Sequence, residues 1–172
     1  MIDLAHLKSL GFDTLIFDLD NTLVGWRSKY LKPSVLDWLK EAHNLNFKMC
    51  IVSNCVFKKR VSYFGEMLGI PAIPKAVKPR KKAFIEAIKL LNSHFAKTVV
   101  IGDQVFTDVL GGNRLGLLTI LVLPVDKREF FATIIQRTAE KLILFGMKRK
   151  GLLHPLKASV PQKISQCKEG KL

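Results

Sequence analysis

Short apolar runs alternate with longer amphipathic segments along most of this 172-residue chain, and this alternation constrains its fold most strongly. Buried strands are predicted at residues 14–17, 49–52, 99–101 and 118–122, with a weaker strand near residues 72–73. Helical patterns fall at residues 33–45, 57–67, 80–94 and 105–114. Such alternation favours an α/β domain with a doubly wound, largely parallel sheet flanked by helices.

Polar side chains follow the predicted strands, at the sheet edge where ligands bind in folds of this class. Asp18 and Asp20 follow the first strand, Ser53 and Asn54 follow the second, and Asp103 follows the fourth. Each of these alone is an ordinary turn or N-cap residue, and an Asp-x-Asp pair by itself is a weak signal. Several carboxylates converging on one edge would repel one another unless a cation lay between them. Such an oxygen-rich site suits Mg²⁺.

Four motifs in order along the chain resemble those of a known superfamily. They are Asp18-Leu19-Asp20-Asn21-Thr22-Leu23, Ser53-Asn54, Lys78-Pro79, and Gly102-Asp103 with Asp108. Together they resemble motifs I to IV of the haloacid dehalogenase (HAD) superfamily, in the form of its class IIIA phosphatases. The stretch from Asp108 to Gly116 further resembles the YqeG family. The resemblance covers residues 14 to about 123 and implies a HAD-like, Rossmannoid core.

The resemblance also implies a role for each matched residue. Asp18 is expected to attack phosphorus and form an aspartyl-phosphate, with Asp20 as general acid and then base. Ser53 is expected to hydrogen-bond a phosphoryl oxygen, and Lys78 to neutralise the charge that develops there. The expected Mg²⁺ ligands are Asp18, the backbone carbonyl of Asp20, Asp103, and Asp108 directly or through water. The expected substrate contacts are Asn54, Lys58 and Lys81, whereas Thr22 and Arg114 are expected to be structural.

The spacing of the motifs predicts that no cap domain covers this site. Only 32 residues separate Asp20 from Ser53, and 24 separate Ser53 from Lys78. Each gap already has to supply a helix and a strand, and the first also a flap. An open site can receive a phosphate carried on a large molecule, such as a lipid in a bilayer, a polynucleotide or a protein.

The charge balance points to an anionic partner, because 28 Lys and Arg residues face 14 Asp and Glu residues, giving a net charge of +14. Basic runs at residues 58–60 and 80–82 fall at predicted helix starts, and residues 127–172 add 11 basic and 3 acidic residues. We expect residues 1–126 to form the phosphatase core, and residues 127–151 a basic amphipathic helix packed on the core or lying on anionic lipid. We expect residues 152–172 to be a flexible tail.

Three functions remain open from the sequence. The first is a Mg²⁺-dependent phosphatase of a phosphate monoester; the YqeG family resembles phosphatidylglycerophosphate phosphatases, which suggests a lipid phosphate. The second is a phosphatase of nucleotides or polynucleotide ends, and the third is a HAD protein bound to RNA or a ribosome. The N-terminus lacks a signal peptide pattern, and the longest apolar run has 11 residues. We therefore expect a cytoplasmic protein, and the sequence leaves open whether it binds peripherally to the inner face of the membrane. The sequence leaves the oligomeric state open.

Overall fold

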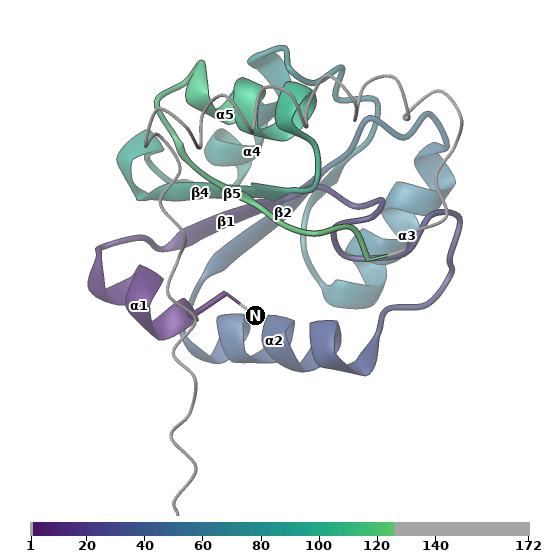
Figure 1. Cartoon of the computed structure of the whole chain (residues 1–172), viewed down its shortest axis with the longest axis horizontal. Coiled ribbons are helices and arrows are strands. Elements are labelled where there is room, and N and C mark those ends of the chain that lie inside the picture. The colour runs from purple at the N-terminus through teal and green to yellow at the C-terminus, as the bar shows by residue number, and fades with distance from the viewer. Residues whose placement is uncertain (1, 126–172) are drawn as a thin grey trace, which may run out of the picture.

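A computed structural model describes residues 2–125, which form a five-stranded, fully parallel sheet between helices (Figure 1). The strand order is β3-β2-β1-β4-β5. The strands are β1 (Thr14–Phe17), β2 (Lys48–Val52), β3 (Ala72–Ile73), β4 (Thr98–Gly102) and β5 (Leu118–Leu121). The central strand β1 pairs with β2 through Phe17 opposite Ile51, and with β4 through Phe17 opposite Ile101. This confirms the predicted α/β class and places the ends of β1, β2 and β4 side by side.

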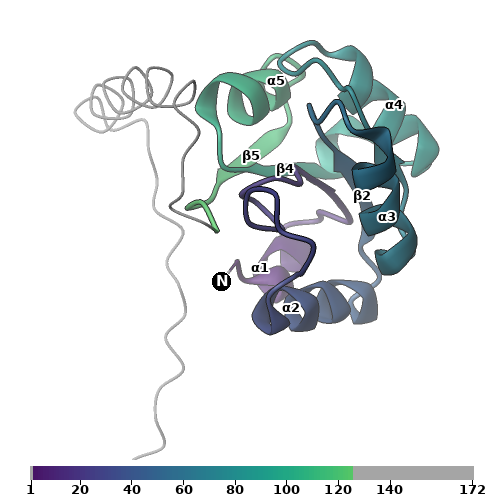
Figure 2. The same cartoon turned by 90° about the vertical axis from the view of Figure 1, so that its right-hand side faces the viewer.

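Helices cover both faces of the sheet (Figures 1 and 2). They are α1 (Leu4–Ser9), α2 (Pro33–Asn44), α3 (Lys58–Leu68), α4 (Lys82–Leu90) and α5 (Leu110–Asn113), with a short 3₁₀ turn η1 (Phe95–Lys97) and a π turn η2 (Val105–Val109). Alternate residues of β1 pack on opposite faces, as strand geometry requires. Leu15 and Phe17 join a core with α1, α2 and α3, whereas Ile16 joins a second core with α4.

Some elements differ from the sequence predictions for identifiable local reasons. The segment predicted as one helix at 105–114 is a π turn followed by the short α5, and the helix predicted at 80–94 is limited to α4. Helix α1 was not predicted; the Asp3 carboxylate caps it by accepting a hydrogen bond from the His6 amide at 2.9 Å. The predicted helix at 127–151 and tail at 152–172 lie outside the described residues.

The connections after β1 and β2 contain no cap domain. The first holds a flap at residues 21–32 and then α2, and the second holds α3. The edge of the sheet where β1, β2 and β4 end is therefore framed by loops, as the motif spacing predicted. Among residues 2–125, no helix has the length and apolar character needed to cross a membrane.

Candidate active site

The predicted motif residues meet where the central strands end. The Asp18 amide donates to the Ile101 carbonyl at 3.0 Å, which extends the β1–β4 ladder by one residue. Asp103 follows β4 directly, and Ser53 follows β2. Carboxylate oxygens of Asp18, Asp103 and Asp108 lie within 4.8 Å of one another, and all three residues are buried. Residues that are up to 90 positions apart in the chain thus form one acidic cluster.

Lys78 lies inside this cluster. Its ammonium Nζ donates to Asp18 Oδ1 and to Asp108 Oδ1, each at 2.6 Å, and its side chain is almost wholly buried. Such short, charge-assisted bonds in a buried setting fix the positions of both carboxylates. The lysine neutralises one of the three negative charges and leaves the cluster acidic.

Burial and charge change the proton affinities of this pair. Burial raises the pKa of Asp18 to about 7, with the charges of Asp108 and Asp103 adding to the rise and that of Lys78 opposing it. Burial by itself lowers the pKa of Lys78, but the charges of Asp18 and Asp108 outweigh it, so this pKa is raised. The amine of Lys78 therefore stays protonated, whereas the buried Asp18 carboxyl group holds its proton more tightly than an exposed aspartate does.

The donor set fits a hard divalent cation. Three buried carboxylates face one ammonium, and carboxylate oxygens are the ligands that Mg²⁺ prefers. A cation held by Asp18, Asp103 and Asp108 would oppose the rise in the Asp18 pKa that burial and the two neighbouring carboxylates cause. Asp20 was also predicted as a ligand, through its backbone carbonyl; its side chain is not among the clustered carboxylates.

A glycine and a π turn place Asp108 in the cluster. Asp108 lies in η2, and its Oδ2 accepts from the Gln104 amide and the Thr107 hydroxyl, both at 3.3 Å. A Cβ atom at Gly102 would collide with the Asp108 carboxyl group. Single π turns occur often at functional sites because they redirect a side chain. The absence of a side chain at position 102 therefore allows Asp108 to approach the end of β4.

The Asp20 carboxylate forms an ion pair with Arg60, which belongs to the basic run at residues 58–60. Arg60 donates to Asp20 Oδ1 from Nη2 at 2.8 Å and from Nε at 3.3 Å, and its Nη1 donates to the Ser28 carbonyl in the flap. The guanidinium also stacks 5.2 Å from the Phe64 ring centroid. The sequence did contain a sign that Arg60 faces inward. Arg60 stands four residues before buried Phe64 and therefore lies beside the apolar stripe of α3.

Ser53 and Asn54 occupy the end of β2. The buried Ser53 hydroxyl accepts from the Cys55 amide at 3.1 Å. The Asn54 side chain brackets the peptide of Lys78: its Oδ1 accepts from the Lys78 amide at 2.7 Å, and its Nδ2 donates to the Lys78 carbonyl at 3.3 Å. Asn54 was predicted to contact substrate, and in this structure it holds the backbone that carries the buried lysine.

The two lysines that were predicted to contact substrate lie at the surface, outside the buried acidic cluster. Lys58 begins α3 and Lys81 precedes α4, and both are exposed. Arg114 donates to the Pro79 carbonyl at 3.4 Å, which agrees with the structural role expected for it. Thr22 is buried at the base of the flap, and its hydroxyl has no hydrogen-bond partner within the described part of the chain.

Known proteins resemble this chain in sequence and in fold. The HAD-hydrolase-like family model matches residues 76–125, which include Lys78, Asp103 and Asp108. The chain is 46% identical over 145 residues to the probable phosphatase YqeG of Bacillus subtilis, and the match covers 84% of each protein. The chain belongs to the YqeG family.

Two further relatives of this YqeG-family chain are more distant. The phosphatidylglycerophosphate phosphatase 1 of Arabidopsis thaliana chloroplasts and mitochondria is 28% identical over 174 residues, covering 96% of this chain and 50% of that protein. A crystal structure of an uncharacterised protein from Listeria monocytogenes superposes with a TM-score of 0.55 at 19% identity, covering 78% of this chain and 99% of that one. The structural match shows a shared fold, and the family model identifies this fold as HAD-like.

Proposed function

We propose that this protein is a divalent-metal-dependent phosphatase that hydrolyses a phosphate monoester, with Mg²⁺ as the metal and a lipid phosphate such as phosphatidylglycerophosphate as the substrate. The observation that carries the proposal is the buried cluster in which Lys78 bridges Asp18 and Asp108 beside Asp103. Buried carboxylates held against a lysine are suited to bind a phosphoryl group together with a cation, and they serve no evident purpose in packing the sheet.

The positions of the side chains support the roles that the family resemblance implies. Asp18 is the nucleophile: an oxygen of its carboxylate forms a bond to phosphorus while the ester oxygen leaves, which gives an aspartyl-phosphate. Asp20 donates a proton to that leaving oxygen and then removes one from the water that hydrolyses the intermediate. Lys78 and the Ser53 hydroxyl donate hydrogen bonds to the transferring group, where negative charge develops. Arg60 holds the Asp20 carboxylate in place.

Asp18, Asp103 and Asp108 would hold the metal, joined by the backbone carbonyl of Asp20. When bound, a divalent cation offsets the repulsion between the carboxylates and the incoming phosphate. Lys58 and Lys81 would attract an anionic substrate, and Asn54 would keep Lys78 at the correct position.

Two observations favour a lipid phosphate. No cap domain intervenes among the described residues at the carboxyl edge of the sheet, which suits a substrate that stays in a bilayer. The Arabidopsis relative carries the name of a lipid phosphatase and matches over nearly the whole of this chain. We also propose a cytoplasmic enzyme that works peripherally at the membrane surface.

The test is phosphate release by the purified full-length chain from a panel of substrates. The panel contains phosphatidylglycerophosphate in mixed micelles, phosphorylated oligonucleotides, nucleotides and sugar phosphates, each with Mg²⁺ and with EDTA. We expect release from the lipid, its loss with EDTA, and its loss in Asp18→Asn. Release from oligonucleotides or nucleotides alone would replace the lipid with the second substrate class, and release that persists in Asp18→Asn would remove the proposed nucleophile.

A further inference from the structure

The three loops around the active site expose large apolar side chains at one edge of the sheet. Tyr30 in the flap is 81% exposed and Phe57 before α3 is 70% exposed, and Val56 and Val77 are exposed as well. These residues come from the connections that follow β1, β2 and β3, which all leave the sheet at its carboxyl edge. Their common position at the edge that also holds the active site makes these side chains candidates for a contact surface.

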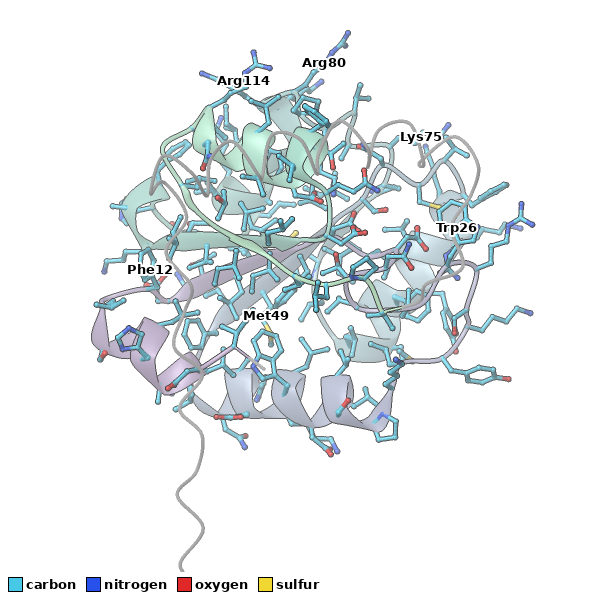
Figure 3. The ribbon with its side chains drawn as sticks, viewed as in Figure 1. Phe12, Trp26, Met49, Lys75, Arg80 and Arg114 are labelled. Atoms are coloured by element: carbon cyan, nitrogen blue, oxygen red, sulfur yellow. The ribbon has the colours of Figure 1, made fainter. Side chains whose placement is uncertain are left out.

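Hydrogen bonds join the three loops into one surface. Arg60 at the start of α3 donates to the Ser28 carbonyl, which brings the flap against the loop that carries Phe57. The Lys75 amide donates to the Cys55 carbonyl at 3.2 Å, which brings the loop of Val77 against that of Val56. Figure 3 shows Trp26 and Lys75 on the side of the molecule away from Phe12, which precedes β1. We call this set, Tyr30, Val56, Phe57 and Val77 with the cations between them, the loop surface.

The charge on these loops is of a single sign. Residues 21–36, 53–65 and 74–85 contain no aspartate or glutamate, while Lys29, Lys58 and Lys75 are exposed among the apolar residues. Aromatic rings beside lysines are typical of proteins that lie at a membrane–water interface, where the rings enter the headgroup region and the ammonium groups meet anionic lipid. The loop surface is complementary in both respects to an anionic bilayer.

Val77 strengthens the case for hydrocarbon as the partner. It is exposed, and its φ of +54° lies in the left-handed region that β-branched residues rarely adopt. Neither solvent nor backbone favours a valine at this position. Aliphatic side chains such as Val56 and Val77 also do not stack on nucleobases, which argues for lipid over single-stranded nucleic acid.

We infer that the loop surface is a membrane-docking site that seats the active-site edge on an anionic bilayer. This inference rests on the proposed lipid-phosphate function and assigns the contact to the active-site loops rather than to residues 127–151. Docked in this way, the chain presents the carboxyl edge of the sheet, where Asp18 follows β1, to a phosphate in the headgroup layer, so that the substrate need not leave the membrane.

The first experiment measures binding of the full chain to vesicles without turnover. The vesicles are phosphatidylcholine alone or mixed with phosphatidylglycerol. The variant Tyr30→Ser/Phe57→Ser removes two exposed rings from the loop surface. The matched control Leu10→Ser/Leu90→Ser removes two side chains that are each 58% exposed. Leu10 precedes β1 and Leu90 ends α4, near the opposite edge of the sheet, where the Lys48 ammonium donates to the Asn92 carbonyl at 2.6 Å.

We expect the wild type to bind the mixed vesicles, the loop variant to bind about tenfold more weakly, and the control to bind like the wild type. Both variants should hydrolyse a small soluble phosphate ester as the wild type does, because neither touches the cluster. Equal vesicle binding by the loop variant and the wild type would overturn the inference. So would a loop variant that keeps vesicle binding and instead loses binding to a single-stranded oligonucleotide. Failure of lipid hydrolysis with vesicle binding intact would instead count against the proposed substrate.

A second measurement uses the two tryptophans of the chain. Trp26 lies in the flap and is 40% exposed, whereas Trp38 is buried and packs edge-on against Phe17 at 5.8 Å. Brominated lipid in the mixed vesicles should quench Trp26 fluorescence and leave Trp38 unaffected, so that Trp26→Phe abolishes the quenching. Quenching that is unchanged in Trp26→Phe, or no quenching of vesicle-bound wild type, would overturn the inference.

Discussion

Arg60 on α3 donates two hydrogen bonds to a single oxygen of Asp20, Oδ1, from Nη2 at 2.8 Å and from Nε at 3.3 Å. The same guanidinium donates to the flap carbonyl of Ser28. The arginine thus ties together the proposed general acid, the flap and α3. Because both bonds end on Oδ1, we expect Oδ2 to be the oxygen that exchanges a proton with the substrate.

Replacing Arg60 should therefore reduce turnover more than substrate binding. We expect Arg60→Ala to lower kcat by roughly 10- to 100-fold for a small soluble phosphate ester, with a smaller change in KM, because the proton donor loses its orientation. Arg60→Lys should recover part of the loss, since an ammonium can still donate to Asp20. Lys59→Ala is the matched control on the same helix and should resemble the wild type. Wild-type kcat in Arg60→Ala, or an equal loss in Lys59→Ala, would contradict the assignment.

The buried Asp18 carboxylate should make the metal-free protein less stable at high pH. Its pKa is raised to about 7 from an ordinary value of 3.8, so the folded state binds its proton more tightly than the unfolded state does. The stability from this group is present at low pH and is lost as the pH rises toward 7 and above. Asp18→Asn removes the buried charge, so we expect its Tm with EDTA to exceed that of the wild type at pH 8 and the difference to shrink at pH 5.

The control for this measurement is Asp37→Asn, since Asp37 is well exposed on α2. It should show no such pH-dependent difference. A Tm of Asp18→Asn below that of the wild type at pH 8 would mean that the ion pair with Lys78 outweighs the cost of burying the carboxylate. Mg²⁺ should raise the Tm of the wild type and have a smaller effect on Asp18→Asn.

The close approach of Asp108 to Gly102 predicts that a side chain at position 102 weakens the response of the protein to Mg²⁺. Gly102→Ala places a methyl group against the Asp108 carboxyl, so we expect the carboxylate to move and the Mg²⁺ dependence of both Tm and turnover to weaken. Gly65→Ala is matched in its crowding, because its Cβ would lie 2.8 Å from that of Ala72, remote from the cluster. It should lower stability and keep the response to Mg²⁺. Equal Mg²⁺ responses in the two variants would contradict this role for Gly102.

The kinetics of an Asn54 variant can tell whether this side chain contacts the substrate or supports Lys78. If its amide serves to hold the Lys78 peptide, Asn54→Ala should lower kcat by about tenfold and leave KM nearly unchanged. A substrate contact would instead raise KM. The measurement is steady-state kinetics on a soluble ester, with Ser62→Ala as a control, since Ser62 is exposed on α3. A raised KM with unchanged kcat would restore the role first predicted for Asn54.

The sequence predicted most of the sheet because each inner strand is apolar after its first residue and is followed directly by polar residues. Asp18 and Asp103 could be assigned to one edge since parallel strands all end on the same side. The π turn before α5 could not be predicted, because Val105–Val109 has no composition that distinguishes it from an α-helix. The inward turn of Arg60 was missed because three basic residues stand together, and only the phase of α3 decides which one faces Asp20.

The pairing of β1 between β2 and β4 has a consequence for how firmly different parts of the site are held. Its amides lie at the centre of the sheet, and the Asp18 amide is bonded into the same ladder. Hydrogen exchange in such a fold is slowest at the centre and fastest in surface loops. We therefore expect slow hydrogen exchange at the Asp18 amide and fast exchange in the flap. The loops can then adapt to a partner while the reacting carboxylate keeps its geometry.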